Sequence, residues 1–167
     1  MANIKNSYPG DTQLTITLAS LATSATKVAG REATFFDNTS NLYTDARVSG
    51  KVTTGTTPTD AKTIEVWIIA PLNDTPTWPD VFDGTDSAET ATSRGILESL
   101  GRMGAIMPTD GTSDRTYFFD IGSVAALFNG FMPSRFTVFV THDTAVNLNS
   151  TGSNHEVSVE PVFQTVA

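Results

Sequence analysis

The chain contains no cysteine among its 167 residues. This absence excludes a disulfide scaffold, a thiolate metal site and a cysteine nucleophile. A chain of this length can bury roughly 70% of the surface that it exposes when unfolded, so a single hydrophobic core can hold it together without such links. We therefore expect one domain over 13–167, preceded by an N-terminal arm over 1–12.

Basic residues are also few: 10 Lys and Arg stand against 18 Asp and Glu, which gives a net charge of -8 at pH 7. Nucleic-acid binding needs clustered Lys and Arg, so we expect no nucleic-acid partner. No stretch reaches the ~18 apolar residues of a membrane span. The first ten residues lack the apolar segment of a secretory signal. We expect no membrane partner, and folding in a cytoplasm.

Apolar and polar side chains alternate in many short runs, as they do in half-buried strands. The run 63–70 is apolar on both faces, which predicts a central strand or one that a partner covers. One of its faces should pack against an apolar face of the run 135–141. These two faces consist of Ile64, Val66 and Ile68 and of Phe136, Val138 and Val140.

Turn residues separate these runs, and we count about eight short strands and one short helix. Gly95, Gly101 and Gly104 disfavour the helix that the apolar spacing of 96–107 also fits, so we expect a bulged strand there. Ser123 is expected to cap a short helix over 124–128. The other expected strands are 13–19, 35–36, 42–54, 116–121, 135–141 and 156–166. This pattern predicts an all-β fold, an antiparallel β-sandwich that is jelly-roll-like, with a barrel as the alternative.

The segment 71–94 is expected to form a long acidic loop, because three prolines interrupt it and acids dominate it. Its acidic residues are Asp74, Asp80, Asp83, Asp86 and Glu89. A loop of this length is usually functional or mobile. The run 83–86 offers oxygen ligands, but the spacing of a calcium-binding loop is missing. We expect a solvated acidic loop, with calcium binding as the alternative.

Groups that could perform catalysis are sparse. His142 and His155 stand at strand ends, where we expect both side chains to face solvent. The nucleophile motif G-x-S-x-G is missing, and two histidines with sequence-distant carboxylates make a poor zinc site. We therefore expect no enzymatic activity, no catalytic residue, no cofactor and no bound metal.

Candidate interaction residues lie in the arm and in the acidic loop. The arm is polar, and we expect it to order only against a neighbouring molecule. Trp78 is a better binding candidate than Trp67, because Trp67 lies within a strand and Trp78 lies in the loop. The candidates are Ile4, Lys5 and Tyr8 in the arm, and Trp78, Val81 and Phe82 in the loop.

Two parts of the chain resemble a group of small structural proteins of tailed bacteriophages. The first part is AGREATFFDNTSNLYTDARVSGKV at Ala29–Val52, together with Ile64–Ile69. The second part is Gly130-Phe131-Met132-Pro133 and then FTVFVTHDTAVNLNSTGSNHEVSVEPVFQTVA. The matching residues are patterns of hydrophobic, Asn, Gly and Thr residues without a catalytic signature, and the segment 71–94 lies outside them.

The resemblance implies a non-enzymatic component of a virion, made in the host cytoplasm. Its most direct form is a capsid decoration (cement) protein that binds the lattice of the major capsid protein and associates with copies of itself. The alternative is a tail-associated module, or a β-sandwich that binds a receptor or a carbohydrate. No functional residue is implied by the resemblance, because the group has no motif of that kind.

Overall fold

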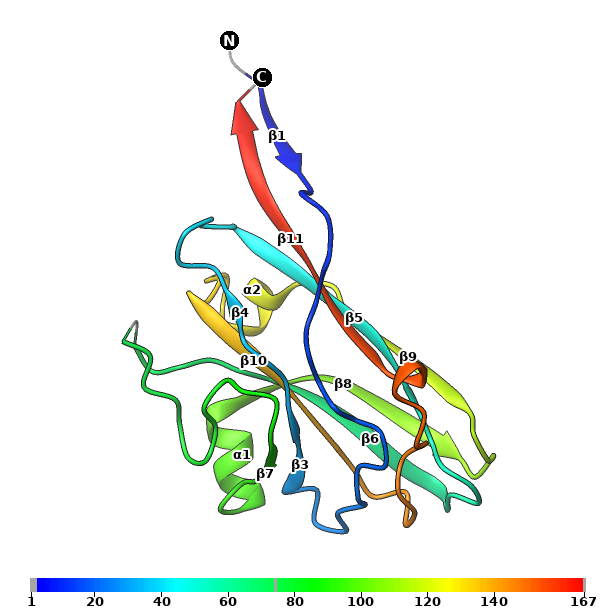
Figure 1. Cartoon of the computed structure of the whole chain (residues 1–167). Coiled ribbons are helices and arrows are strands. Elements are labelled where there is room, and N and C mark those ends of the chain that lie inside the picture. The colour runs from blue at the N-terminus through cyan, green and yellow to red at the C-terminus, as the bar shows by residue number, and fades with distance from the viewer. Residues whose placement is uncertain (1–2, 74, 167) are drawn as a thin grey trace.

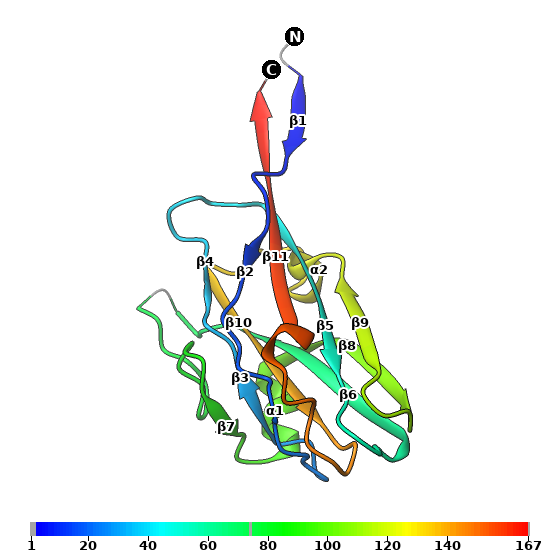
Figure 2. The ribbon, with the colours of Figure 1, turned by 45° about the vertical axis from the view of Figure 1, so that its right-hand side comes forward.

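The computed structural model describes residues 3–73 and 75–166, and it contains two antiparallel sheets (Figures 1 and 2). The first sheet has the strand order β1 (Ile4–Ser7), β11 (Glu156–Val166), β5 (Asp45–Thr53) and β9 (Thr116–Ile121), and β2 (Thr12–Gln13) also pairs with β11. The second has the order β7 (Ala88–Thr90), β3 (Ala29–Glu32), β10 (Arg135–His142), β6 (Asp60–Ile69) and β8 (Gly101–Asp110), and β4 (Phe36–Asp37) also pairs with β10. The predicted all-β sandwich is confirmed.

Strands β6 and β10 form the centre of the second sheet. Their register places Val66 opposite Val140 and Ile68 opposite Val138. The predicted contact between these two apolar faces therefore exists, but it joins neighbouring strands of one sheet rather than two stacked sheets. Both faces enter the main core, which also contains Val48, Val52, Val157 and Val159 of the first sheet.

The opposite face of the second sheet supports a second core. Trp67, Ile69 and Phe139 point to this side and are buried. Leu97 of helix α1 (Arg94–Leu100) and Phe82 cover them, and the rings of Phe82 and Phe139 meet edge to face with their centroids 5.2 Å apart. Figure 1 shows α1 on the side of this sheet that faces away from the first sheet. The apolar residues on both faces of the run 63–70 are thus covered within the chain.

A buried carboxylate lies at the polar end of the second core. Glu65 accepts hydrogen bonds from the indole Nε1 of Trp67 at 3.1 Å and from Nη1 of Arg94 at 2.6 Å. Lys27 adds an ion pair through Nζ at 3.1 Å. The guanidinium of Arg94 lies 5.0 Å from the centroid of the Trp67 ring. These charge-assisted bonds join helix α1 to the sheet.

Helix α1 corrects the first part of the bulged strand predicted over 96–107, whereas the part from Gly101 on is confirmed as strand β8, whose register with β6 shifts between Val66 and Trp67. The side chain of Ser93 caps the helix by accepting the N–H of Ile96 at 3.1 Å. Gly101 ends it, and a Cβ there would lie 3.0 Å from the carbonyl oxygen of Leu97 and 3.1 Å from the Trp67 ring. Of the glycines that disfavoured a helix, Gly95 lies within α1, Gly101 ends it, and Gly104 lies in β8, where it accommodates Ile121.

The predicted strand over 13–19 is also wrong. Leu14 and Leu18 are buried, as the alternation predicted, but regular pairing stops after β2. The backbone continues through single bonds, such as the one from the Leu14 N–H to the Val157 carbonyl oxygen at 2.9 Å. The helix capped by Ser123 is confirmed as α2 (Val124–Leu127). With α1 and a 3-10 turn at Gly152–Asn154, the described residues contain more helix than the single short one predicted. None of their helices is long and apolar enough to cross a bilayer.

We predict that Phe139→Ala lowers the free energy of unfolding by about 3–5 kcal/mol, because it opens a large cavity in the second core. The matched variant Phe118→Ala removes a ring that is 74% exposed and should change stability by less than about 0.5 kcal/mol. Denaturant unfolding of the two variants measures both effects. Equal losses in the two variants would contradict the predicted contribution of Phe139.

Candidate functional site

The segment predicted to be an unattached arm forms strand β1, which pairs with the end of β11. Ile4 lies opposite Val166, and Ser7 lies opposite Phe163. These two strand ends form a ribbon that projects beyond the body of the sandwich in both views (Figures 1 and 2). We call residues 4–7 and 163–166 the ribbon. The expectation that the arm orders only against another molecule is wrong, because its partner lies within the chain.

The ribbon continues the outer face of the first sheet. Residues directly opposite each other in an antiparallel pair share a face, so Ile4 and Asn6 lie on the same side as Val166 and Gln164. Alternation along β11 places its remaining outward side chains on this side too; they are Glu156, Ser158, Glu160 and Val162. The ribbon and the body of the sheet thus share one continuous outer face.

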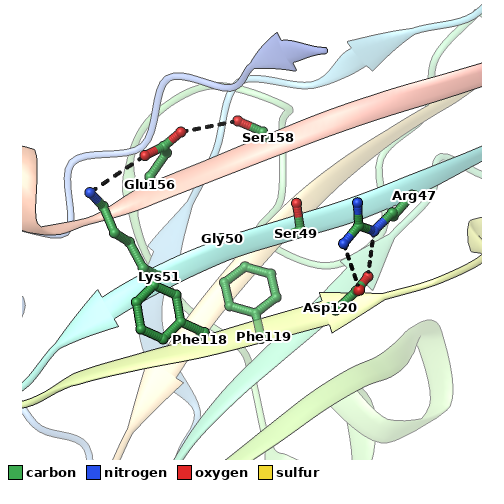
Figure 3. A pocket seen from close by; sticks show the side chains of 9 residues that line it. All are labelled: Arg47, Ser49, Gly50, Lys51, Phe118, Phe119, Asp120, Glu156 and Ser158. Atoms are coloured by element: carbon green, nitrogen blue, oxygen red, sulfur yellow. Dashed lines mark hydrogen bonds and ion pairs between the residues drawn. The ribbon is translucent and has the colours of Figure 1, made fainter. Parts of the chain in front are cut away.

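An open hollow of about 440 Å³ lies on this outer face. Figure 3 shows the residues that line it, where β11, β5 and β9 lie side by side. Two outward serines, Ser49 and Ser158, face each other at its centre. Phe118 stands at its rim with 74% of its surface exposed. The inward ring of Phe119 lies beneath Gly50, where a Cβ would approach the ring to 2.8 Å.

Most of the charged side chains around the hollow are paired with one another. Arg47 donates two hydrogen bonds to Asp120, at 2.9 and 2.8 Å, and lies 3.6 Å from Glu160. These bonds hold the pKa of the Asp120 carboxyl below its usual value. Lys51 and Glu156 form a second pair at 3.6 Å. Because such pairs already satisfy their members, the hollow offers a charge-balanced surface beside one exposed ring.

The predicted arm residues take two different positions. Ile4 and Tyr8 are 69% and 60% exposed, and Val166 beside Ile4 is 73% exposed. Lys5 points to the other face of the ribbon, opposite Thr165. Ile4 therefore lies on the same outer face as Phe118 and Arg47. The sequence analysis did not identify Phe118 or Arg47 as candidate contact residues. The pair Phe118-Phe119 carries no signal of which ring faces outward, because either would suit a half-buried strand.

Most of the candidate interaction residues in the acidic loop pack against other parts of the same chain. Phe82 is buried in the second core, so it is not a free contact residue. Trp78 is half-buried against Phe35, with ring centroids 6.1 Å apart. Val81 alone of the three keeps a sizeable exposed surface, and it adjoins the buried Phe82.

The acids of the same segment act as local anchors. Asp80 accepts hydrogen bonds from both the N–H and the hydroxyl of Thr92, and Asp83 does the same for Thr85. Asp86 accepts from Arg31 at 2.6 Å. Among residues 3–73 and 75–166, no three His, Asp or Glu side chains gather in a way that could hold a metal ion.

Both histidines are buried, which overturns the expectation that they face solvent. The Nε2 of His142 donates to the Leu21 carbonyl oxygen at 3.1 Å, and its Nδ1 contacts the Thr144 hydroxyl at 2.9 Å. His155 contacts the Asn149 carbonyl oxygen at 2.9 Å through Nε2. Burial lowers the pKa of both imidazoles. The loops that fold over the strand ends, 20–24 and 147–151, were not identifiable as covers from the sequence.

Glu32 is a buried carboxylate that fixes the loop to the second sheet. It accepts the N–H of Gly84 at 2.7 Å and that of Asp83 at 3.1 Å. Burial raises its pKa to about 7, and the nearby charges of Asp83 and Glu89 act in the same direction. Gly84 has a positive φ of 79°, and a Cβ there would come within 2.9 Å of the Phe35 ring, so the turn at this anchor requires glycine.

Comparison with known proteins adds no relative to this description. No protein-family model matches the chain. No curated protein matches it either.

Glu32→Gln should remove a pH-dependent part of the stability. The folded state binds the Glu32 proton more tightly than the unfolded state does, so this group's contribution falls as pH rises from about 4.5 to about 7. We predict that the free energy of unfolding of the variant, relative to the parent, increases by up to about 3 kcal/mol between pH 5 and pH 8.

The comparison uses unfolding curves of both proteins at each pH. His142 and His155 favour stability as pH rises through their range, but they are present in both proteins and cancel in the difference. Asp120→Asn is the matched control, because the pKa of Asp120 is lowered and its difference should stay flat over this pH range. A flat difference for Glu32→Gln as well would contradict the raised pKa.

Proposed function

We propose that the protein is a non-enzymatic structural component of a tailed-phage virion, a capsid decoration protein that binds the major capsid protein through the ribbon and the adjoining outer face. The observation that carries this proposal is the ribbon itself. It extends beyond the sandwich and presents Ile4 and Val166, both about 70% exposed, on one face. Apolar side chains on a projecting element are typical of contact surfaces.

The ribbon has open hydrogen-bonding edges. Strand β1 is the last strand of the first sheet among the described residues, and the β5 ladder along β11 ends at Val162. A two-stranded ribbon is marginally stable alone in water, and its edges offer unpaired N–H and C=O groups. A strand from a neighbour could complete such an edge, and main-chain bonds would then add to the apolar contact. A shell subunit and a second copy of this chain are both suitable sources.

The resemblance to small structural proteins of tailed phages is the second support. Its two parts include β11 and β5, the strands that form the outer face and one side of the ribbon. The positions of the titratable groups agree with action by contact, since the histidines hold loops in place and the acids of 71–94 anchor turns. Assembly on a lattice requires surfaces of this kind rather than a reacting group.

A second candidate function rests on the hollow of Figure 3. An exposed aromatic ring beside hydroxyl side chains can hold a sugar, and Phe118, Ser49 and Ser158 supply these groups. This alternative is a tail-associated or receptor-binding module. Copy number in purified virions separates the two, because a decoration protein is present in hundreds of copies and a tail module in a few.

The direct test is binding to phage particles prepared without the protein. We predict that Ile4→Ser with Val166→Ser reduces co-sedimentation with the particles at least about tenfold, the effect of losing roughly 1.4 kcal/mol of contact. The melting temperature should stay nearly unchanged, because both side chains are exposed.

Ile106→Ser is the matched control, since Ile106 is exposed on β8, at the edge of the other sheet. It should bind like the parent. Full occupancy by the ribbon variant would reject the ribbon as the attachment surface, and a specific loss with Phe118→Ala would favour the sugar-binding alternative.

A further inference from the structure

A second surface, separate from the outer face, combines exposed apolar side chains with a cation. It is an open hollow of about 450 Å³ between the end of β6, the end of α1 and the turn after α2. Leu72, Leu100, Phe128, Phe131 and Pro133 line it, together with Arg102. We call it the Arg102 hollow.

Apolar exposure is concentrated here. Leu72 and Phe131 are 73% and 79% exposed, and they come from segments about sixty residues apart that meet at this hollow. Single exposed apolar side chains are ordinary on a protein surface, but two that line one concave site with three further apolar neighbours form a patch. Such patches usually contact another molecule.

Arg102 has no carboxylate partner within the described part of the chain. Its Nη1 donates to the carbonyl oxygen of Gly101 at 3.1 Å, and its guanidinium lies 5.6 Å from the centroid of the Phe128 ring. Among the described residues every other arginine forms an ion pair, and so does every lysine except Lys5; the paired cations are Lys27, Arg31, Arg47, Lys51, Lys62, Arg94, Arg115 and Arg135. In a chain with net charge -8, an arginine without a carboxylate partner beside an apolar hollow is therefore exceptional.

We propose that the Arg102 hollow binds a peptide segment of another protein, in which an aromatic or branched aliphatic side chain lies next to a carboxylate. The apolar side chain would fill the hollow between Leu72 and Phe131. The carboxylate would pair with Arg102, whose planar guanidinium can donate two parallel hydrogen bonds. Charge complementarity selects this ligand, because an acidic group supplies the partner that Arg102 lacks.

A second copy of the chain fits this hollow less well. Two acids near this chain's own exposed apolar side chains are already engaged. Asp83, near Val81, accepts hydrogen bonds from Thr85, and Asp120, near Phe118, is paired with Arg47. A copy that offered either of these acids would have to break such bonds before it reached Arg102, whereas a separate protein with a free carboxylate would not.

This inference goes beyond the proposed function and does not rest on it. The hollow shares no lining residue with the ribbon or with the hollow of Figure 3. Loss of binding by the ribbon variants would leave the Arg102 hollow untouched, and failure here would leave the ribbon proposal standing.

The test uses two blocked dipeptides that differ only in charge, acetyl-Phe-Asp-amide and acetyl-Phe-Asn-amide. Each is titrated into the full chain labelled with nitrogen-15, and amide and arginine Nε–H shifts are followed by NMR. We expect shifts at Arg102, Leu100 and Phe128, with the Asp peptide binding about three- to tenfold more tightly than the Asn peptide. Arg102→Gln should abolish that difference while leaving the fold intact.

Arg115→Gln is the matched control, because it makes the same change in net charge at an arginine that is paired with Asp110. It should keep the preference for the Asp peptide. Equal binding of the two peptides to the parent, or an equal loss of preference in both variants, would overturn the proposal. Self-association of the free protein that disappears in Arg102→Gln, measured by sedimentation velocity, would assign the hollow to a second copy instead.

Discussion

The pairing of β6 with β10 imposes the main constraint on this fold, because both strands are apolar on both faces. Val66 and Val140 face the first sheet, whereas Trp67 and Phe139 face the opposite way. A sheet of this kind needs a cover on each side, since exposed apolar area of this size would otherwise cost several kcal/mol. The first sheet covers one face. Helix α1 and the segment around Phe82 cover the other, which is why an acid-rich segment is held close to the body.

This constraint also determines which surfaces remain for contacts. Residues of 71–94 that the sequence suggested as contact residues for a partner, Phe82 above all, are needed in the second core. The surfaces that stay open lie at the margins of the two layers, where the ribbon extends the first sheet and the Arg102 hollow forms where β6, α1 and α2 end. Contact by the outer face and by the hollow could therefore occur at the same time, with different partners.

The sequence predicted the layers better than the surfaces. A short apolar run identified β6, alternation identified β10, and Ser123 identified α2, because each signal depends on neighbouring residues. Helix α1 was missed because Gly101 lowers helix propensity on average, yet here it stands at the end, where the backbone must pass close to Trp67. The ribbon could not be predicted, since nothing near Ile4 indicates a partner at the far end of the chain, and the burial of His142 depends on the distant Leu21.

Strand β11 is the one element that belongs to both the body and the ribbon. Its first half is bonded to β5 by a ladder that runs from Glu156 to Val162, and its last four residues pair with β1. A molecule that gripped the ribbon and moved away along its axis would pull β11 parallel to β5. Such a load acts in shear on all the ladder bonds together rather than peeling them one by one. The β5–β11 ladder should therefore resist a pulling force that is applied to the ribbon along its axis.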